Sequence, residues 1–97
     1  MQKDTASKSA ITTAVMRAAH QILDEDPKIL EDPIAVGLVP GSSEEEIRRR
    51  EEEFKQHPNR SIFPLRSRFT EDQLADAFRN GVRQYVILGA GFDTFAY

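Results

Sequence analysis

Cysteine and tryptophan are missing from this chain of 97 residues, and histidine occurs only twice. The lack of cysteine excludes disulfide bonds and thiolate metal sites, and two histidines alone do not make a metal-binding set. No apolar run reaches the roughly 20 residues that a membrane-spanning helix needs, and the N-terminal residues lack the apolar stretch of a secretory signal. We therefore expect a cytoplasmic protein that binds neither a metal nor a membrane.

The chain also has no excess of positive charge. Thirteen basic residues stand against sixteen acidic ones, which gives a formal net charge of −3. Residues 1–58 hold twelve acidic and eight basic residues, and residues 59–97 hold four and five. Neither part has the basic footprint of a nucleic-acid-binding protein, so no nucleic-acid partner is expected. The composition, 39% apolar and 30% charged, fits one small soluble domain.

Apolar periodicity predicts a first helix over residues 7–23. Its apolar positions follow the i, i+3, i+4, i+7 spacing of an amphipathic helix: Ile11, Ala14, Val15, Ala18, Ala19, Ile22 and Leu23. Pro27 ends this segment, and Asp32 is expected to cap a short helix that begins at Pro33. His20 lies at the edge of the apolar face, where a packed side chain is a better interpretation than a ligand.

Residues 44–56, EEEIRRREEEFKQ, predict one solvated helix. Ser43 and Glu46 have the spacing of a capping box at its start. Charged pairs four residues apart support it: Glu44–Arg48, Glu45–Arg49 and Glu46–Arg50. Only Ile47 and Phe54 are apolar, so this helix is expected to contact its neighbour lightly.

A further helix is predicted through the sixties, and Gly81 is suited to end the helical part of the chain. At Thr70 the sequence allows either a new capping box with Gln73 or a continuation of the same helix. The next residues, Tyr85–Leu88, have no polar side and predict a strand that is buried on both faces. The chain is thus expected to be helical up to one strand and a glycine-rich turn.

One buried strand cannot form a sheet by itself. A parallel partner would require a crossover of about a dozen residues or more, and only nine follow Leu88. We therefore expect the chain to be the N-terminal piece of a larger α/β protein, or else to pair with another chain.

The turn after the strand, G-A-G-F-D-T, narrows the choice of ligand. Gly89 and Gly91 allow the backbone to approach a ligand closely. The third glycine of a dinucleotide fingerprint would fall at Thr94, and no Gly-Lys-Ser/Thr follows, so a nicotinamide site is disfavoured and a P-loop is excluded. An ordinary tight turn from strand to helix is the alternative interpretation.

The stretch QYVILGAGFDTFAY resembles the first motif of class I S-adenosylmethionine-dependent methyltransferases. More narrowly, it is similar to the leucine carboxyl methyltransferase family and its bacterial relatives, which include polyketide O-methyltransferases. Three further stretches agree with that family in the same order: TASKSAITTAVMRAAH, DEDPKILEDPIA and RSRFTEDQLADAFRNGVRQYVILGAGFDT. The resemblance covers nearly the whole chain.

The resemblance implies an α/β fold with a Rossmann-like methyltransferase sheet. In this chain, residues 1–58 would be a helical cover segment. Residues 59–97 would begin the S-adenosylmethionine-binding domain with a helix, the first strand and the glycine turn. The implied reaction transfers a methyl group from S-adenosylmethionine to a carboxyl or hydroxyl oxygen of a small-molecule or carboxylate-bearing acceptor.

The resemblance also implies the site residues. The backbone of Gly89, Ala90 and Gly91 would lie along the cofactor. Arg66, with Arg68 as the near alternative, would pair with the cofactor carboxylate, and Lys8 would assist. Asp93 is interpreted as a residue beside the site that caps the following helix or hydrogen-bonds the turn, in preference to a catalytic base or metal ligand. No catalytic residue and no metal ligand is predicted.

The sequence departs from the family pattern at Phe95, where relatives have arginine. The acidic residue that holds the ribose hydroxyls and the later motifs are expected beyond Tyr97, so the piece alone is expected to be inactive. Two alternatives remain. One is a non-catalytic helical fragment that self-associates through exposed apolar helix and strand surfaces. The other is a different small-molecule binder on the same Rossmann-like scaffold.

Overall fold

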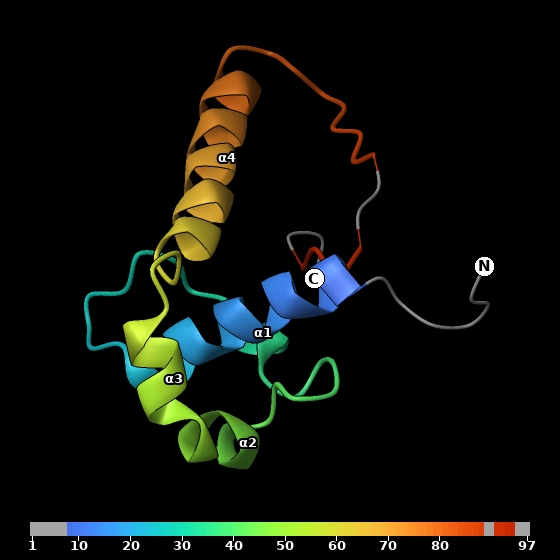
Figure 1. Ribbon diagram of the computed structural model, residues 1–97. Coiled ribbons are helices and arrows are strands. Elements are labelled where there is room, and N and C mark those ends of the chain that lie inside the picture. The colour runs from blue at the N-terminus through green and yellow to red at the C-terminus, as the bar shows by residue number, and fades with distance from the viewer. Residues whose placement is uncertain (1–7, 89–90, 95–97) are drawn as a thin grey trace, which may run out of the picture.

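The computed structural model describes residues 8–88 and 91–94, and within these residues the chain is helical (Figure 1). The elements in order are α1 (Lys8–Leu23), the 3-10 helix η1 (Pro33–Ala35), α2 (Glu44–Arg49), α3 (Glu51–Gln56) and α4 (Ile62–Arg79). Helix α1 lies in the middle and contacts each of the others. None of the described helices is long and apolar enough to cross a membrane.

Helix α1 confirms the prediction made from its periodicity. The small apolar side chains of its central turns are buried, with Ala14 and Ala18 fully enclosed. They form one core with residues of the other elements: Ala35, Val39, Ile47 and Phe54. The alanines allow η1 and the short helices to approach the axis of α1 closely, which accounts for its central place.

The predicted single helix over residues 44–56 is wrong, because the chain breaks into α2 and α3 at Arg50. The backbone of Arg50 has φ −107° and ψ 22°, outside the helical region. The bend turns Ile47 and Phe54 to the inside, where they are 0% and 4% exposed. The expected light contact is therefore also wrong, since both side chains belong to the core.

The polar signals of this stretch are mostly confirmed. The Ser43 hydroxyl accepts a hydrogen bond from the Glu46 amide at 3.2 Å and donates one to its carboxylate at 2.8 Å. That hydroxyl lowers the pKa of Glu46 below its ordinary value. The pairs Glu44–Arg48 and Glu45–Arg49 form at 3.0 and 4.0 Å. The pair Glu46–Arg50 does not, because the break directs Arg50 to Glu53.

Helix α4 is continuous through the sixties and seventies. The Thr70 hydroxyl donates to the Arg66 carbonyl oxygen at 3.0 Å within the helix, so continuation, not a second capping box, is the outcome. Gly81, with φ +98°, follows the helix end as predicted. The later turns of α4 stand away from the other helices in Figure 1. Pro64 and Leu74 are its buried residues, and most of its other apolar side chains are exposed, with Phe69 at 63%.

The predicted buried strand is not formed. Residues 85–88 have no regular structure, and Val86 and Leu88 are 75% and 88% exposed. A strand requires backbone partners on a neighbouring strand, and residues 8–88 and 91–94 provide no strand to pair with. The Rossmann-like sheet is thus absent from the described part of the chain. After α4 the chain returns to the first turns of α1, where residues 91–94 lie (Figure 1).

Candidate functional site

A cavity of about 790 Å³ opens between α1, α4 and residues 91–94. Helix α4 lines it with one stripe at the i, i+3, i+4, i+7, i+8 positions of a helical face: Phe63, Arg66, Ser67, Thr70 and Glu71. Helix α1 supplies Ser9, Ala10, Thr13 and Arg17, and the loop before η1 supplies Leu30 and Asp32. A volume of this size suits a small-molecule ligand.

A buried ion pair between Arg17 and Asp32 connects the segments that line this cavity. The Nε atom of Arg17 lies 3.0 Å from Oδ2 of Asp32, and both side chains are less than a tenth exposed. Arg17 also donates to the carbonyl oxygen of Phe92, and the hydroxyl of Thr94 donates to Oδ1 of Asp32 at 2.7 Å. The pair therefore links α1, the loop before η1 and the glycine turn.

This arrangement corrects the role predicted for Asp32. Pro33 does open a short helix, as expected, but the Asp32 side chain makes no capping hydrogen bond to it. Its two oxygens are taken by Arg17 and Thr94 instead. Asp32 binds Arg17 and does not cap η1, because a buried guanidinium without a counter-ion lowers the stability of the fold far more than an uncapped helix end does.

Gly91 requires a glycine for two separate reasons. Its φ of +55° lies in the left-handed region that side chains disfavour. In addition, a Cβ atom at this position would lie 3.3 Å from the Cβ of Ala10, which is closer than ordinary contact. The absence of a side chain at Gly91 allows the turn to lie this close to α1.

The two candidate arginines differ in what they contact. Arg66 lines the cavity, and its side chain forms no ion pair with any residue that the structure describes. Arg68 is bound to Asp72 at 3.0 Å and donates to the carbonyl oxygen of Ile29 at 3.0 Å. Among the described residues that line this cavity, Arg66 is therefore the cation that is left to pair with a ligand.

Of the six residues predicted for the site, the structure brings Arg66, Gly91 and Asp93 together at the cavity. Lys8 is exposed at the start of α1 and is not among the lining residues, although Ser9 beside it is. The remaining two predicted residues, Gly89 and Ala90, lie outside the described residues.

Sequence reasoning missed Arg17, Asp32 and Glu71. A signal for Arg17 was present, because it follows Ala14 by three positions and precedes Ala18 on the apolar face of α1. A charged residue inside an apolar stripe requires an opposite charge, and Asp32 supplies it. The signal for Glu71 was its place on the same helical stripe as Arg66.

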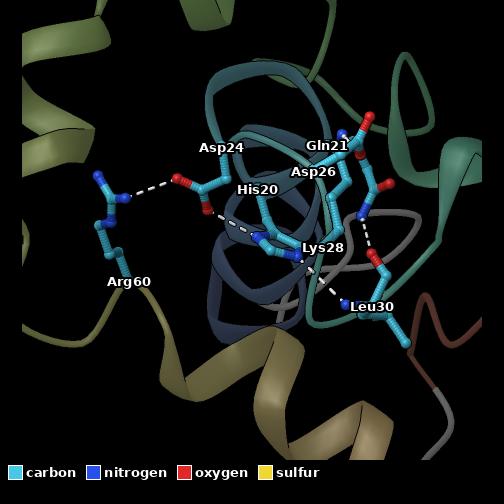
Figure 2. Close-up of polar contacts among 7 residues, drawn as sticks. All are labelled: His20, Gln21, Asp24, Asp26, Lys28, Leu30 and Arg60. Carbon is cyan, nitrogen blue, oxygen red and sulfur yellow. Dashed lines mark hydrogen bonds and ion pairs between the residues drawn. The ribbon is translucent and has the colours of Figure 1, made fainter.

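A second polar cluster, centred on His20, holds the loop after α1 (Figure 2). Its Nε2 accepts a hydrogen bond from the Leu30 amide at 3.2 Å, so the ring proton is on Nδ1, which lies 2.6 Å from the Asp24 carboxylate. Arg60 pairs with the other oxygen of Asp24 at 2.6 Å, and Gln21 donates to the Leu30 carbonyl at 2.8 Å.

The His20 cluster confirms the interpretation of His20 as a packed side chain. His20 is 5% exposed and does not line the cavity. The cluster instead fixes Leu30 two residues before Asp32, and both of these do line it. Among residues 8–88 and 91–94 no group of three or more histidine, aspartate or glutamate side chains is arranged to hold a metal ion.

Comparison with known proteins places this chain in a family. The sequence profile of the leucine carboxyl methyltransferase family matches residues 10–97. A relative from Mycolicibacterium paratuberculosis is 37% identical over 93 residues, which cover 88% of this chain and 35% of the relative. Relatives from Mycobacterium avium and Mycobacterium marinum are 37% and 33% identical, over 88% and 97% of this chain and 31% and 34% of their own lengths.

Each of these relatives is named as a predicted S-adenosyl-L-methionine-dependent methyltransferase. The chain spans about a third of their length. No solved structure matches it. Because the family profile covers residues 10–97, the chain belongs to the leucine carboxyl methyltransferase family.

Proposed function

We propose that this chain forms part of the cofactor site of an S-adenosylmethionine-dependent O-methyltransferase. The observation that carries the proposal is one shared cavity, which is lined both by an arginine free of ion pairs to the described residues and by a tight glycine turn. Both features fit the amino-acid end of the cofactor. The cofactor carboxylate requires a cation, and a backbone that approaches the ligand closely requires a residue without a side chain. Membership of the family supports the same cofactor.

Bound S-adenosylmethionine supplies a methyl group to a carboxyl or hydroxyl oxygen of the acceptor. The residues of this chain bind and position. The Arg66 guanidinium pairs with the cofactor carboxylate, in the two-pronged geometry that makes such contacts strong. Lys8 adds positive charge at the start of α1. Arg17 and Asp32 hold the turn at residues 91–94 against α1, so that its backbone stays in place along the ligand.

The organisation proposed for the chain follows from these roles. Residues 1–58 act as a helical cover, and α1 within them forms one wall of the cavity. Residues 59–97 begin the Rossmann-like cofactor-binding domain, with α4 and the glycine turn forming the opposing walls.

The proposal is tested by calorimetric titration of the 97-residue chain with S-adenosylhomocysteine. Arg66→Gln should weaken binding by about tenfold or more, since a hydrogen-bonded charge contributes about 1.5–3 kcal/mol. Arg49→Gln, which changes an exposed arginine of α2, is the matched control and should leave binding unchanged. No binding by the unaltered chain would overturn the proposal. Equal affinities for the Arg66 and Arg49 variants would remove Arg66 from the site.

A second candidate function, self-association, is favoured by the exposed apolar side chains of α4 and of the residues that follow it. Phe69, Val86 and Leu88 are each more than 60% exposed, and surfaces of this kind mark contacts with other proteins. Sedimentation of the chain at increasing concentration tests this candidate. A mass that rises with concentration, and that Phe69→Gln returns to the monomer value, would support it. A monomer throughout would exclude it.

A further inference from the structure

Glu71 is a lining residue of the cavity that the proposed function leaves without a role. It lies on the same stripe of α4 as Arg66 and Thr70, and its side chain is only partly exposed. It makes no hydrogen bond or ion pair with any residue that the structure describes. Glutamates beside a cation usually pair with it, so this isolation calls for an explanation.

The surroundings of Glu71 are unfavourable to its negative charge. Partial burial, followed by the charges of Asp32 and Asp93, raises the pKa of Glu71 above its ordinary value, while Arg68 acts in the opposite direction. The nearby cations are directed elsewhere, since Arg17 is bound to Asp32 and Arg68 to Asp72. The cavity thus has negative charge around Glu71 that no cation among the described residues fully balances.

The same cavity wall offers positive charge at Arg66. Glu71 follows Arg66 by five positions, which corresponds to about 7.5 Å along the axis of α4. Both side chains are long and flexible, and both line the same space. A ligand that carries a carboxylate and an ammonium group on one carbon can pair with Arg66 and Glu71 at the same time. A simple anion would pair with Arg66 but would leave the charge of Glu71 repelled by Asp32 and Asp93.

We propose that Glu71 binds the α-ammonium group of the cofactor's amino-acid end while Arg66 binds its carboxylate, so that α4 recognises a zwitterion. This inference rests on the proposed function, which assigned only the cofactor carboxylate, and it adds a residue that binds the ammonium group. A role for Glu71 as a base that accepts the acceptor's proton would use the same carboxylate, but it would not depend on the ligand's ammonium group. The two roles therefore separate when that group is removed.

The test uses the 97-residue chain and three ligands in calorimetric titrations. S-Adenosylhomocysteine carries both charges, its desamino analogue keeps only the carboxylate, and 5′-methylthioadenosine lacks both. The unaltered chain should bind S-adenosylhomocysteine about tenfold or more tightly than the desamino analogue. Glu71→Gln should remove that preference and leave the affinity for the desamino analogue unchanged. Arg66→Gln should weaken binding of both carboxylate ligands but not of 5′-methylthioadenosine.

Glu52→Gln is the matched control, because Glu52 is an exposed glutamate on α3, away from the cavity. It should bind all three ligands as the unaltered chain does. If the unaltered chain binds S-adenosylhomocysteine no better than the desamino analogue, or if Glu71→Gln keeps the preference, the inference is overturned and the proposed function stands. If S-adenosylhomocysteine does not bind at all, the proposed function itself fails. The comparison of ligands on the unaltered chain needs no variant to fold.

Discussion

Most apolar side chains are buried in one region of this molecule and exposed in another. In the core region, residues 8–57, Ile47 and Phe54 are 0% and 4% exposed, whereas in the arm, residues 62–88, Phe69 and Leu88 are 63% and 88% exposed. The core region closes because two short helices bend around the alanine face of α1. The arm packs its start against α1 and directs most of its length outward (Figure 1).

The difference shows where the candidate site belongs. The cavity lies at the junction, with one wall from the core region and one from the arm. The glycine turn is held at this junction by polar contacts, since Arg17 and Asp32 bind Phe92 and Thr94, and by packing of the Phe92 side chain against the core. Hydrogen bonds and ion pairs are directional, so they fix the position of the turn along α1. Apolar packing is not directional and would not fix that position by itself.

The largest expected effect comes from breaking the buried pair that supports this junction. Arg17→Ala leaves Asp32 buried without a counter-ion and should lower the free energy of unfolding by about 3–5 kcal/mol, measured by urea denaturation. The double variant Arg17→Met, Asp32→Leu should recover most of that stability, because it removes both charges together. A loss below about 1 kcal/mol in the single variant would show that the pair does not hold the structure.

The contrast between the two regions is tested by truncating one phenylalanine in each. Phe54→Ala should lower the free energy of unfolding by about 3 kcal/mol, because it opens a cavity in the core region. Phe69→Ala removes an exposed ring and should change it by no more than about 0.5 kcal/mol. Denaturant midpoints of the two variants give the comparison directly. Similar losses at both positions would mean that the arm is packed as tightly as the core region.

Gly91→Ala should have an intermediate effect, since it forces a side chain into left-handed backbone. The expected loss is about 1–2 kcal/mol in thermal unfolding, and affinity for S-adenosylhomocysteine should fall as Ala10 and the turn move apart. Gly37→Ala is the matched control, because Gly37 has φ +78° and open space around it. It should lose similar stability and keep its affinity. Equal losses of affinity in both variants would argue against a special role for the turn.

The smallest expected effect concerns Glu71. Its pKa in the folded chain is raised by burial and by Asp32 and Asp93, so its ionisation destabilises the fold at neutral pH. Glu71→Gln should therefore raise the melting temperature slightly at pH 7. The gain should shrink as the pH falls through the raised pKa and should vanish below the ordinary value of 4.5. Glu52→Gln should show no such trend, and a gain that persists at acid pH would contradict the assignment.

Local signals in the sequence were sufficient for much of this fold. The stripe of α1, the Ser43 capping box and the helix end near Gly81 each depend on residues within a few positions of one another, and each is confirmed. The break at Arg50 has no such signal, because neither glycine nor proline marks it. It follows from the burial of Ile47 and Phe54 against α1, which is a tertiary effect.

The candidate site was also predictable only in part, because some of its contacts join residues that lie far apart in the sequence. Arg66, Gly91 and Asp93 could be matched to a family motif, but Arg17 and Asp32 pair across 15 positions, and Thr94 joins Asp32 across 62. Sequence spacing cannot show which loop will supply the counter-ion. The strand at residues 85–88 failed as a prediction because its hydrophobic pattern describes a sheet environment, and no neighbouring strand is present among the described residues.

The central claim is that the junction between the core region and the arm binds the amino-acid end of the cofactor. Amide chemical shifts of the 97-residue chain, followed during titration with S-adenosylhomocysteine, test it most directly. The account predicts saturable shifts at residues 91–94, along the α4 stripe from Phe63 to Glu71 and in the first turns of α1, with α2 and α3 unchanged. Shifts centred on α2 and α3, or none at millimolar ligand, would contradict it.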